Sequence, residues 1–115
     1  MQFNVGDARM PPDIGIVFMT AANREEAGLI ARALVEQRLA ACVQIVADIR
    51  SLYWWEGRLC DEPEILCIAK TTAACFDELA AEVRRLHSYA VPEIVFVPIS
   101  DAAPDYWRWV AEVTK

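Results

Sequence analysis

The segment between residues 49 and 71 constrains the fold more than any other, because it predicts a β-hairpin too long for a small domain. Two runs of strand-forming residues meet at Glu56-Gly57, which is typical of a tight turn. The first run extends from about Val43 to Trp55 and, at ~3.3 Å per residue, measures about 43 Å. A compact chain of 115 residues has a diameter of about 34 Å. The tip of the hairpin is therefore expected to project from its own domain, even if a bulge near Asp48 bends the strand.

Aromatic residues gather beside this turn, where the core of the same domain does not reach. They are Tyr53, Trp54 and Trp55. Large aromatic side chains are typical anchors of protein interfaces. The hydrophobic fraction of 56% is also high for a soluble monomer and is consistent with apolar surface buried between subunits. We therefore predict that the three rings contribute to an oligomer interface.

The whole pattern predicts strands and helices in the order β-α-β-β-α-β, followed by a short C-terminal helix. Strands are expected at 14–20, 43–55, 60–70 and 94–97, and the helices begin after Asn23, at about Thr72 and at Pro104. The expected buried face of the last helix is Tyr106, Trp109, Val110 and Val113. Two β-α-β halves joined by a hairpin form a ferredoxin-like sandwich of the α+β class, with the helices on one face of an antiparallel sheet. Residues 1–13 are expected to be a disordered leader, and residues 14–115 a single domain.

Composition excludes several functions. A net charge of −6 argues against nucleic-acid binding, which needs a basic surface. No apolar run approaches the ~20 residues of a membrane span, and no secretory signal is recognisable, so we expect a cytoplasmic protein without membrane contact. The cysteines form no C-x-x-C pair and are expected to be reduced.

Four stretches resemble the CutA family of divalent-cation tolerance proteins. They are residues 38–43 (RLAACV), 51–57 (SLYWWEG), 64–71 (ending in Lys70-Thr71) and 89–93 (YAVPE). The resemblance implies a ferredoxin-like fold assembled as a tight homotrimer similar to the PII signalling proteins. It also implies a response to divalent metal ions, with copper or another divalent cation as a weakly bound ligand. No cofactor is expected to be needed for folding, and no established reaction comes with the resemblance. The protein partner is unknown.

The resemblance also implies a metal site, at Met19 and His87. This chain has methionine where the family has a cysteine, and Leu86 precedes the single histidine where the family has a pair. One thioether and one imidazole make a poor Cu(II) site. The alternative for His87 is a position at the end of the second helix, where the macrodipole favours a partly protonated ring.

Four further residues occupy motif positions of the family: Glu64, Lys70, Tyr89 and Glu93. They are predicted either to line a polar cleft between subunits or to form ion pairs that fix the register of the trimer. Acidic residues nearer the turn, Asp61 and Glu62, either hold a hard cation or keep the exposed strands soluble.

These features lead to three hypotheses. The first is a trimeric, non-enzymatic protein of the cation-tolerance type. The second is a PII-like module that holds a small ligand in inter-subunit clefts. The third is an enzyme that uses an inter-subunit carboxylate as general acid or base, which would require a raised carboxyl pKa.

Overall fold

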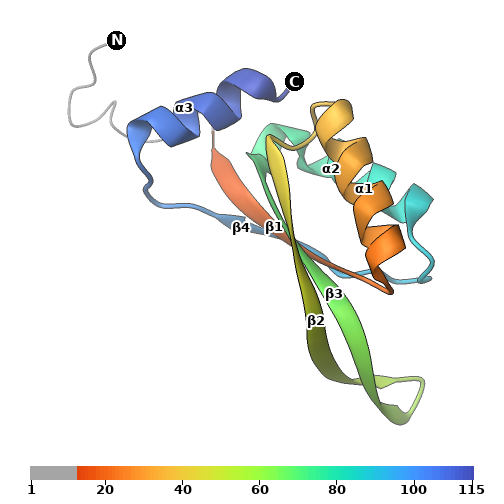
Figure 1. Ribbon diagram of the computed structural model, residues 1–115. Coiled ribbons are helices and arrows are strands. Elements are labelled where there is room, and N and C mark those ends of the chain that lie inside the picture. Colours follow the sequence, from red (N-terminus) through yellow and green to blue (C-terminus); the bar gives the residue numbers. More distant parts are fainter. Residues whose placement is uncertain (1–12) are drawn as a thin grey trace.

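The computed structural model describes residues 13–115, and the elements follow the predicted order (Figure 1). The strands are β1 (Ile14–Ala21), β2 (Cys42–Trp55), β3 (Arg58–Thr72) and β4 (Ile94–Pro98), and the helices are α1 (Arg24–Glu36), α2 (Ala73–Leu86) and α3 (Pro104–Val113). The predicted disordered leader, residues 1–13, lies outside the described residues except for Asp13.

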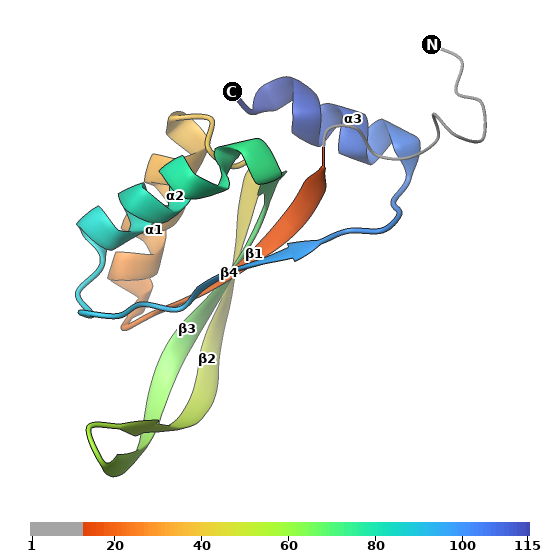
Figure 2. The same ribbon diagram turned by 180° about the vertical axis from the view of Figure 1, so that it is seen from behind.

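The sheet is antiparallel throughout, with the strand order β2-β3-β1-β4. The two central strands are therefore β1 and β3, which are connected to the helices of the two β-α-β halves. Helices α1 and α2 cover the same face of this sheet, as the two opposite views show (Figures 1 and 2). This arrangement confirms the predicted ferredoxin-like sandwich of the α+β class.

The main core lies between the sheet and these two helices. It contains Val17 and Met19 from β1, Cys67 and Ala69 from β3, and a stripe from each helix, all almost fully buried. Ile30 and Leu34 of α1, and Leu79 and Val83 of α2, supply those stripes at helical spacing. Helical spacing accounts for both stripes, whereas Val35, next to Leu34 on α1, is 42% exposed.

Helix α3 packs at the other end of the sheet from the hairpin (Figure 1). Its buried residues are Trp107 and Val110, which join Ile14 and Ala41 in a second, smaller cluster. Tyr106 and Trp109 are 39% and 41% exposed, so the predicted buried face of this helix was wrong except at Val110 and the partly buried Val113. The segment has aromatic residues at positions 106, 107 and 109, and their spacing alone does not select one face.

The hairpin extends well beyond the sheet, as predicted. β1 pairs with β3 only between Ile65 and Thr72, so residues 49–55 and 58–64 pair solely with each other. We call this two-stranded segment the ribbon. A bulge is present at the position that the sequence left open, because the β2–β3 register shifts between Val46 and Ile49 and Asp48 has a φ of 63°. The chain extends over 53 × 25 × 22 Å, and its radius of gyration of 15.6 Å exceeds the ~13 Å of a compact chain of this length.

Candidate functional site

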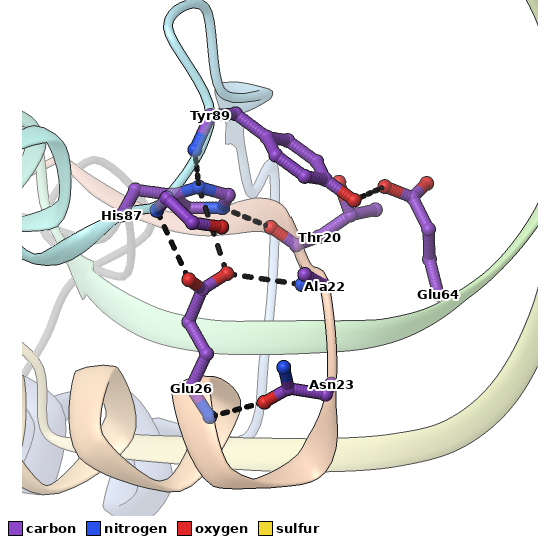
Figure 3. Close-up of polar contacts among 8 residues, drawn as sticks. Thr20, Ala22, Asn23, Glu26, Glu64, His87 and Tyr89 are labelled. Atoms are coloured by element: carbon purple, nitrogen blue, oxygen red, sulfur yellow. Dashed lines mark hydrogen bonds and ion pairs between the residues drawn. The ribbon is translucent and has the colours of Figure 1, made fainter.

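The site begins at the start of α1, where the chain turns away from β1. Asn23 is the N-cap, and its Oδ1 accepts a hydrogen bond of 2.8 Å from the Glu26 amide. The Glu26 carboxylate reaches back and accepts a bond of 3.0 Å from the Ala22 amide, a variant of the capping box. This local geometry holds Glu26 beneath the loop that follows α2 (Figure 3).

The same carboxylate fixes that loop. Glu26 Oε1 accepts a hydrogen bond of 3.0 Å from the Ser88 amide, and Oε2 lies 3.6 Å from His87 Nδ1. Partial burial raises the pKa of Glu26, but the bonds from Ala22 and Ser88 outweigh this and lower it overall. A single ionised side chain therefore connects the N-terminus of one helix to the segment beyond the other.

His87 is buried, with a side chain that is 0% exposed, and both ring nitrogens have partners within the chain. Nε2 lies 2.7 Å from the Thr20 carbonyl oxygen, which only accepts, so Nε2 carries the proton. Nδ1 accepts a hydrogen bond of 3.0 Å from the Tyr89 amide. Both ring nitrogens are thus occupied by backbone groups.

Tyr89 continues the network outward. Its ring contacts His87 at a centroid distance of 4.7 Å, and its hydroxyl donates a hydrogen bond of 2.8 Å to Glu64 Oε2 on β3 (Figure 3). Burial, followed by the bond and the charge of Glu64, raises the pKa of Tyr89, so the phenol stays protonated at neutral pH. Glu64 itself is only 6% exposed.

A cleft of about 850 Å³ opens between the ribbon, from residue 50 to residue 56, and the loop after α2. Its walls include Thr20, Tyr53, Trp55, Glu64, Tyr89 and Glu93. Desolvation and the charge of Glu64 raise the pKa of Glu93. Desolvation and neighbouring negative charges, including that of Glu64, also raise the pKa of Tyr53. These groups therefore influence one another across the cleft.

The structure brings together three of the four residues predicted for a cleft: Glu64, Tyr89 and Glu93. Lys70 lies further along β3, opposite Ile16 and Cys42, where its ammonium group donates to Gln44 Oε1. It is separated from Glu64 by six residues of extended chain, about 20 Å at ~3.3 Å each. A contribution of Lys70 to a cleft therefore requires a second copy of the chain.

The two predicted metal ligands, Met19 and His87, lie in different surroundings. Met19 is 1% exposed within the main core, and His87 already uses both ring nitrogens. Within residues 13–115, no group of three or more His, Cys, Asp or Glu residues is arranged to hold a metal ion. The geometry does not fit a metal held by Met19 and His87, because a bond to His87 would first have to displace a backbone partner.

The three aromatic residues at the tip of the ribbon alternate faces, as a strand requires. Tyr53 and Trp55 line the cleft, whereas Trp54 is 73% exposed on the opposite side. Leu59, which pairs with Trp54 and is 62% exposed, extends this uncovered apolar surface, and Leu52, at 58% exposure, borders the cleft.

Sequence reasoning missed the connection between Glu26, His87 and Thr20. The 60 residues that lie between Glu26 and His87 carry no pattern that pairs them. The available signal was the capping box itself, since a carboxylate fixed at a helix N-terminus is a ready acceptor for a nearby loop.

The sheet order, the projecting ribbon and the cleft beside it define a ferredoxin-like α+β protein with an unusually long hairpin between its two β-α-β halves. The chain belongs to the CutA family, since the family profile described as CutA1 divalent ion tolerance protein matches residues 15–113. This confirms the family suggested by the four sequence stretches.

Individual relatives agree with this assignment. The divalent-cation tolerance protein CutA of Thermus thermophilus is 44% identical over 99 residues, which cover 86% of this chain and 96% of that protein. The solved structure of the Thermus protein has a TM-score of 0.87 at 43% identity, covering 89% and 99% of the two chains. A structure from Archaeoglobus fulgidus, described as a periplasmic divalent cation tolerance protein CutA, has a TM-score of 0.86 at 37% identity and covers 89% and 99%. Mouse protein CutA is 37% identical over 110 residues, and the match covers 96% of this chain but only 62% of the mouse protein.

None of the helices between residues 13 and 115 is long and apolar enough to cross a membrane.

Proposed function

We propose that this chain acts as a homotrimeric, non-enzymatic binding protein in the response to divalent metal ions, and that its ligand occupies the cleft between the ribbon and the loop after α2. The observation that carries the proposal is the cleft itself, a space of about 850 Å³ bordered by buried polar groups and aromatic rings. This volume lies within the range of small-molecule sites, roughly 300–1,000 Å³. The arrangement is consistent with the PII-like architecture expected from the family resemblance.

The ribbon supports the trimeric part of the proposal. Trp54, Leu52 and Leu59 are each more than half exposed in the single chain. A contiguous apolar surface of this kind is characteristic of a protein interface. In an assembly of identical copies, the ribbon of one subunit would pack against its neighbour and bury this apolar surface.

The oligomeric state is tested by sedimentation and light scattering of the wild type and of Trp55→Ala and Tyr53→Ala. We expect a trimer for the wild type and a measurable fraction of smaller species for each variant at low concentration. Gly28→Ala, in α1 and with nothing within 4 Å of the added carbon, is the matched control and should stay trimeric. A single 12.9 kDa particle for the wild type would contradict the proposal.

Direct metal binding is proposed to be weak, and the response to metal to depend on the assembly or on a protein partner. The buried, doubly bonded ring of His87 supports this, because ligation would cost a backbone hydrogen bond. Calorimetric titration of the wild type and His87→Ala with Cu(II), Cu(I) and Zn(II) provides the test. We expect the same weak heats from both proteins, whereas strong binding lost in the variant would restore His87 as a ligand.

We propose the cytoplasm as the location. The support is that four cysteines, Cys42, Cys60, Cys67 and Cys75, are free thiols in the folded chain, as is usual in reducing compartments. Fractionation of cells producing the full-length protein tests this, and recovery in the periplasm, where the Archaeoglobus relative is described, would contradict it.

A further inference from the structure

We propose that the cleft selects a small organic ammonium ion, whose charge is balanced by Glu64 and Glu93 and whose alkyl groups lie against the aromatic walls. This inference rests on the proposed function, since it names the class of ligand for the same cleft. It depends on three features of the described residues: an unbalanced buried charge, the aromatic rings and the size of the space.

The first feature is the charge of the cleft. Its lining carries three carboxylates, those of Glu56, Glu64 and Glu93, and one cation, Arg50. Arg50 is already neutralised by a two-pronged ion pair with Asp61, with N–O distances of 2.8 and 2.6 Å. The cleft of the single chain is therefore strongly negative.

Glu64 is the centre of this charge. It is only 6% exposed, and one oxygen accepts the Tyr89 hydroxyl at 2.8 Å. No ion pair to Glu64, and no hydrogen bond to its Oε1, is formed by any residue from 13 to 115. Burying a carboxylate without an opposite charge is costly, so a cation entering the cleft would gain the attraction that the chain itself leaves unused.

The second feature is the aromatic lining. Tyr53, Trp55 and Tyr89 all border the same cleft. Because the pKa values of both tyrosines are raised, their rings remain neutral at physiological pH. Neutral aromatic faces attract organic cations, and several rings beside a carboxylate form the usual surroundings of bound alkylammonium groups.

The third feature distinguishes an organic cation from a metal ion. Hard divalent cations require six or more oxygen ligands at close range, whereas rings occupy much of this wall. The volume of about 850 Å³ also far exceeds a bare ion and suits a molecule of several heavy atoms. Charge, aromatic surface and size together indicate an alkylammonium compound.

The test compares choline with 3,3-dimethyl-1-butanol, its uncharged carbon analogue of nearly the same shape. Both are titrated into the assembled wild-type protein at constant ionic strength, with Trp fluorescence and NMR chemical shifts as readouts. We expect saturable binding of choline at least about tenfold tighter than that of the alcohol. Equal binding of the two compounds, or no saturation by choline, would overturn the proposal.

Variants locate the binding. Glu64→Gln and Glu93→Gln should each reduce the preference for choline over the alcohol. Glu93→Gln leaves the Tyr89–Glu64 hydrogen bond in place, so it provides the test even if Glu64→Gln disturbs the fold. Glu112→Gln removes the same charge from an exposed position on α3 and should leave the preference unchanged. An equal loss in Glu112→Gln would mean that choline senses only the net charge of the protein, which would contradict a site in the cleft.

Two further results separate this inference from the proposed function. If the wild type binds no choline but Lys70→Met does, the lysine of a neighbouring subunit neutralises the cleft and the ammonium proposal is wrong, while the trimer stands. If light scattering shows a monomer that still prefers choline, the proposed assembly fails and the ligand class stands.

Discussion

His87 joins two backbone segments that are 67 residues apart, the end of β1 and the loop after α2. Its Nε2 donates to the Thr20 carbonyl and its Nδ1 accepts from the Tyr89 amide, so the ring acts as a bridge between a strand and a loop. Because the bridge places Tyr89 against Glu64, this histidine positions one wall of the cleft. A structural role of this kind explains why the ring is fully buried.

The hydroxyl of Tyr89 provides a direct measure of this network. Tyr89→Phe removes the only hydrogen bond that the described residues donate to the buried Glu64 carboxylate. We expect the free energy of unfolding to fall by about 1.5–3 kcal/mol, as for hydrogen bonds to charged groups. Urea unfolding followed by circular dichroism measures the change.

The control is Tyr106→Phe, because among residues 13–115 that hydroxyl contacts only the Cys42 sulfur, at 3.6 Å. Sulfur is a weak hydrogen-bond partner, so this variant should lose less than about 1 kcal/mol. Equal losses from the two variants would show that the Tyr89–Glu64 bond contributes no more than a surface contact.

Glu82 on α2 gives the protein a defined sensitivity to acid. Two bonds from Arg85, of 2.8 and 2.7 Å, and one of 2.7 Å from Gln37 lower the pKa of this carboxyl from 4.5 to about 2. The folded chain thus prefers the ionised form, and this stabilisation is complete above about pH 4.5 and disappears as the pH falls toward 2. The difference in unfolding free energy between the wild type and Glu82→Gln should therefore shrink across this range, whereas a constant difference would contradict the lowered pKa.

At the scale of elements, sequence patterns predicted the features that depend on residues close together in the chain. The strands, the two long helices and the Asn23 cap all follow from residue spacing and side-chain type. Thr72 is the N-cap of α2 as predicted, yet its side chain makes no capping hydrogen bond. The predicted buried face of α3 was wrong because the burial of Trp107 rather than Trp109 depends on contacts with Ile14 and Ala41, which are far away in the sequence.

The backbone conformation of the ribbon turn can be tested by comparing a glycine-to-alanine substitution there with one in helix α1. Glu56 and Gly57 have φ angles of 50° and 76°, as in the type I′ turns that close two-residue hairpins. Gly57→Ala meets no atom within 4 Å, so its cost is the left-handed backbone alone, about 1–2 kcal/mol of unfolding free energy.

Gly28→Ala is the matched control, with equally open space around the added carbon but an α-helical backbone. It should stabilise the protein by about 0.5–1 kcal/mol. Thermal and urea unfolding at one protein concentration would measure both variants, and a change of the same sign in the two would contradict the assigned turn conformation.

For the molecule as a whole, the candidate site was only partly predictable. Motif positions pointed to Glu64, Tyr89 and Glu93, which do meet in one cleft. They also pointed to Lys70, although strand geometry places its side chain far along β3 in the same chain. The bridge through His87 could not be predicted, because its partners at Thr20 and Tyr89 are backbone groups that any sequence would supply.

The division of the molecule into a packed domain and a ribbon leads to the last prediction. No buried hydrophobic residue of the described chain lies between residues 52 and 61. Replacing these ten residues by Asn-Gly would connect Ser51 directly to its partner Glu62 through a favourable two-residue turn. We expect the shortened chain to keep its helices and cooperative unfolding, because both hydrophobic clusters are intact.

The same shortened chain should be monomeric, since it lacks Tyr53, Trp54 and Trp55, and it should lose one wall of the cleft. Circular dichroism and light scattering on a single sample measure the two properties separately. Glu56→Asn, which introduces the same Asn-Gly turn at its natural place, is the control and should remain assembled. A shortened chain that still assembles would show that the sheet and helices, rather than the ribbon, hold the subunits together.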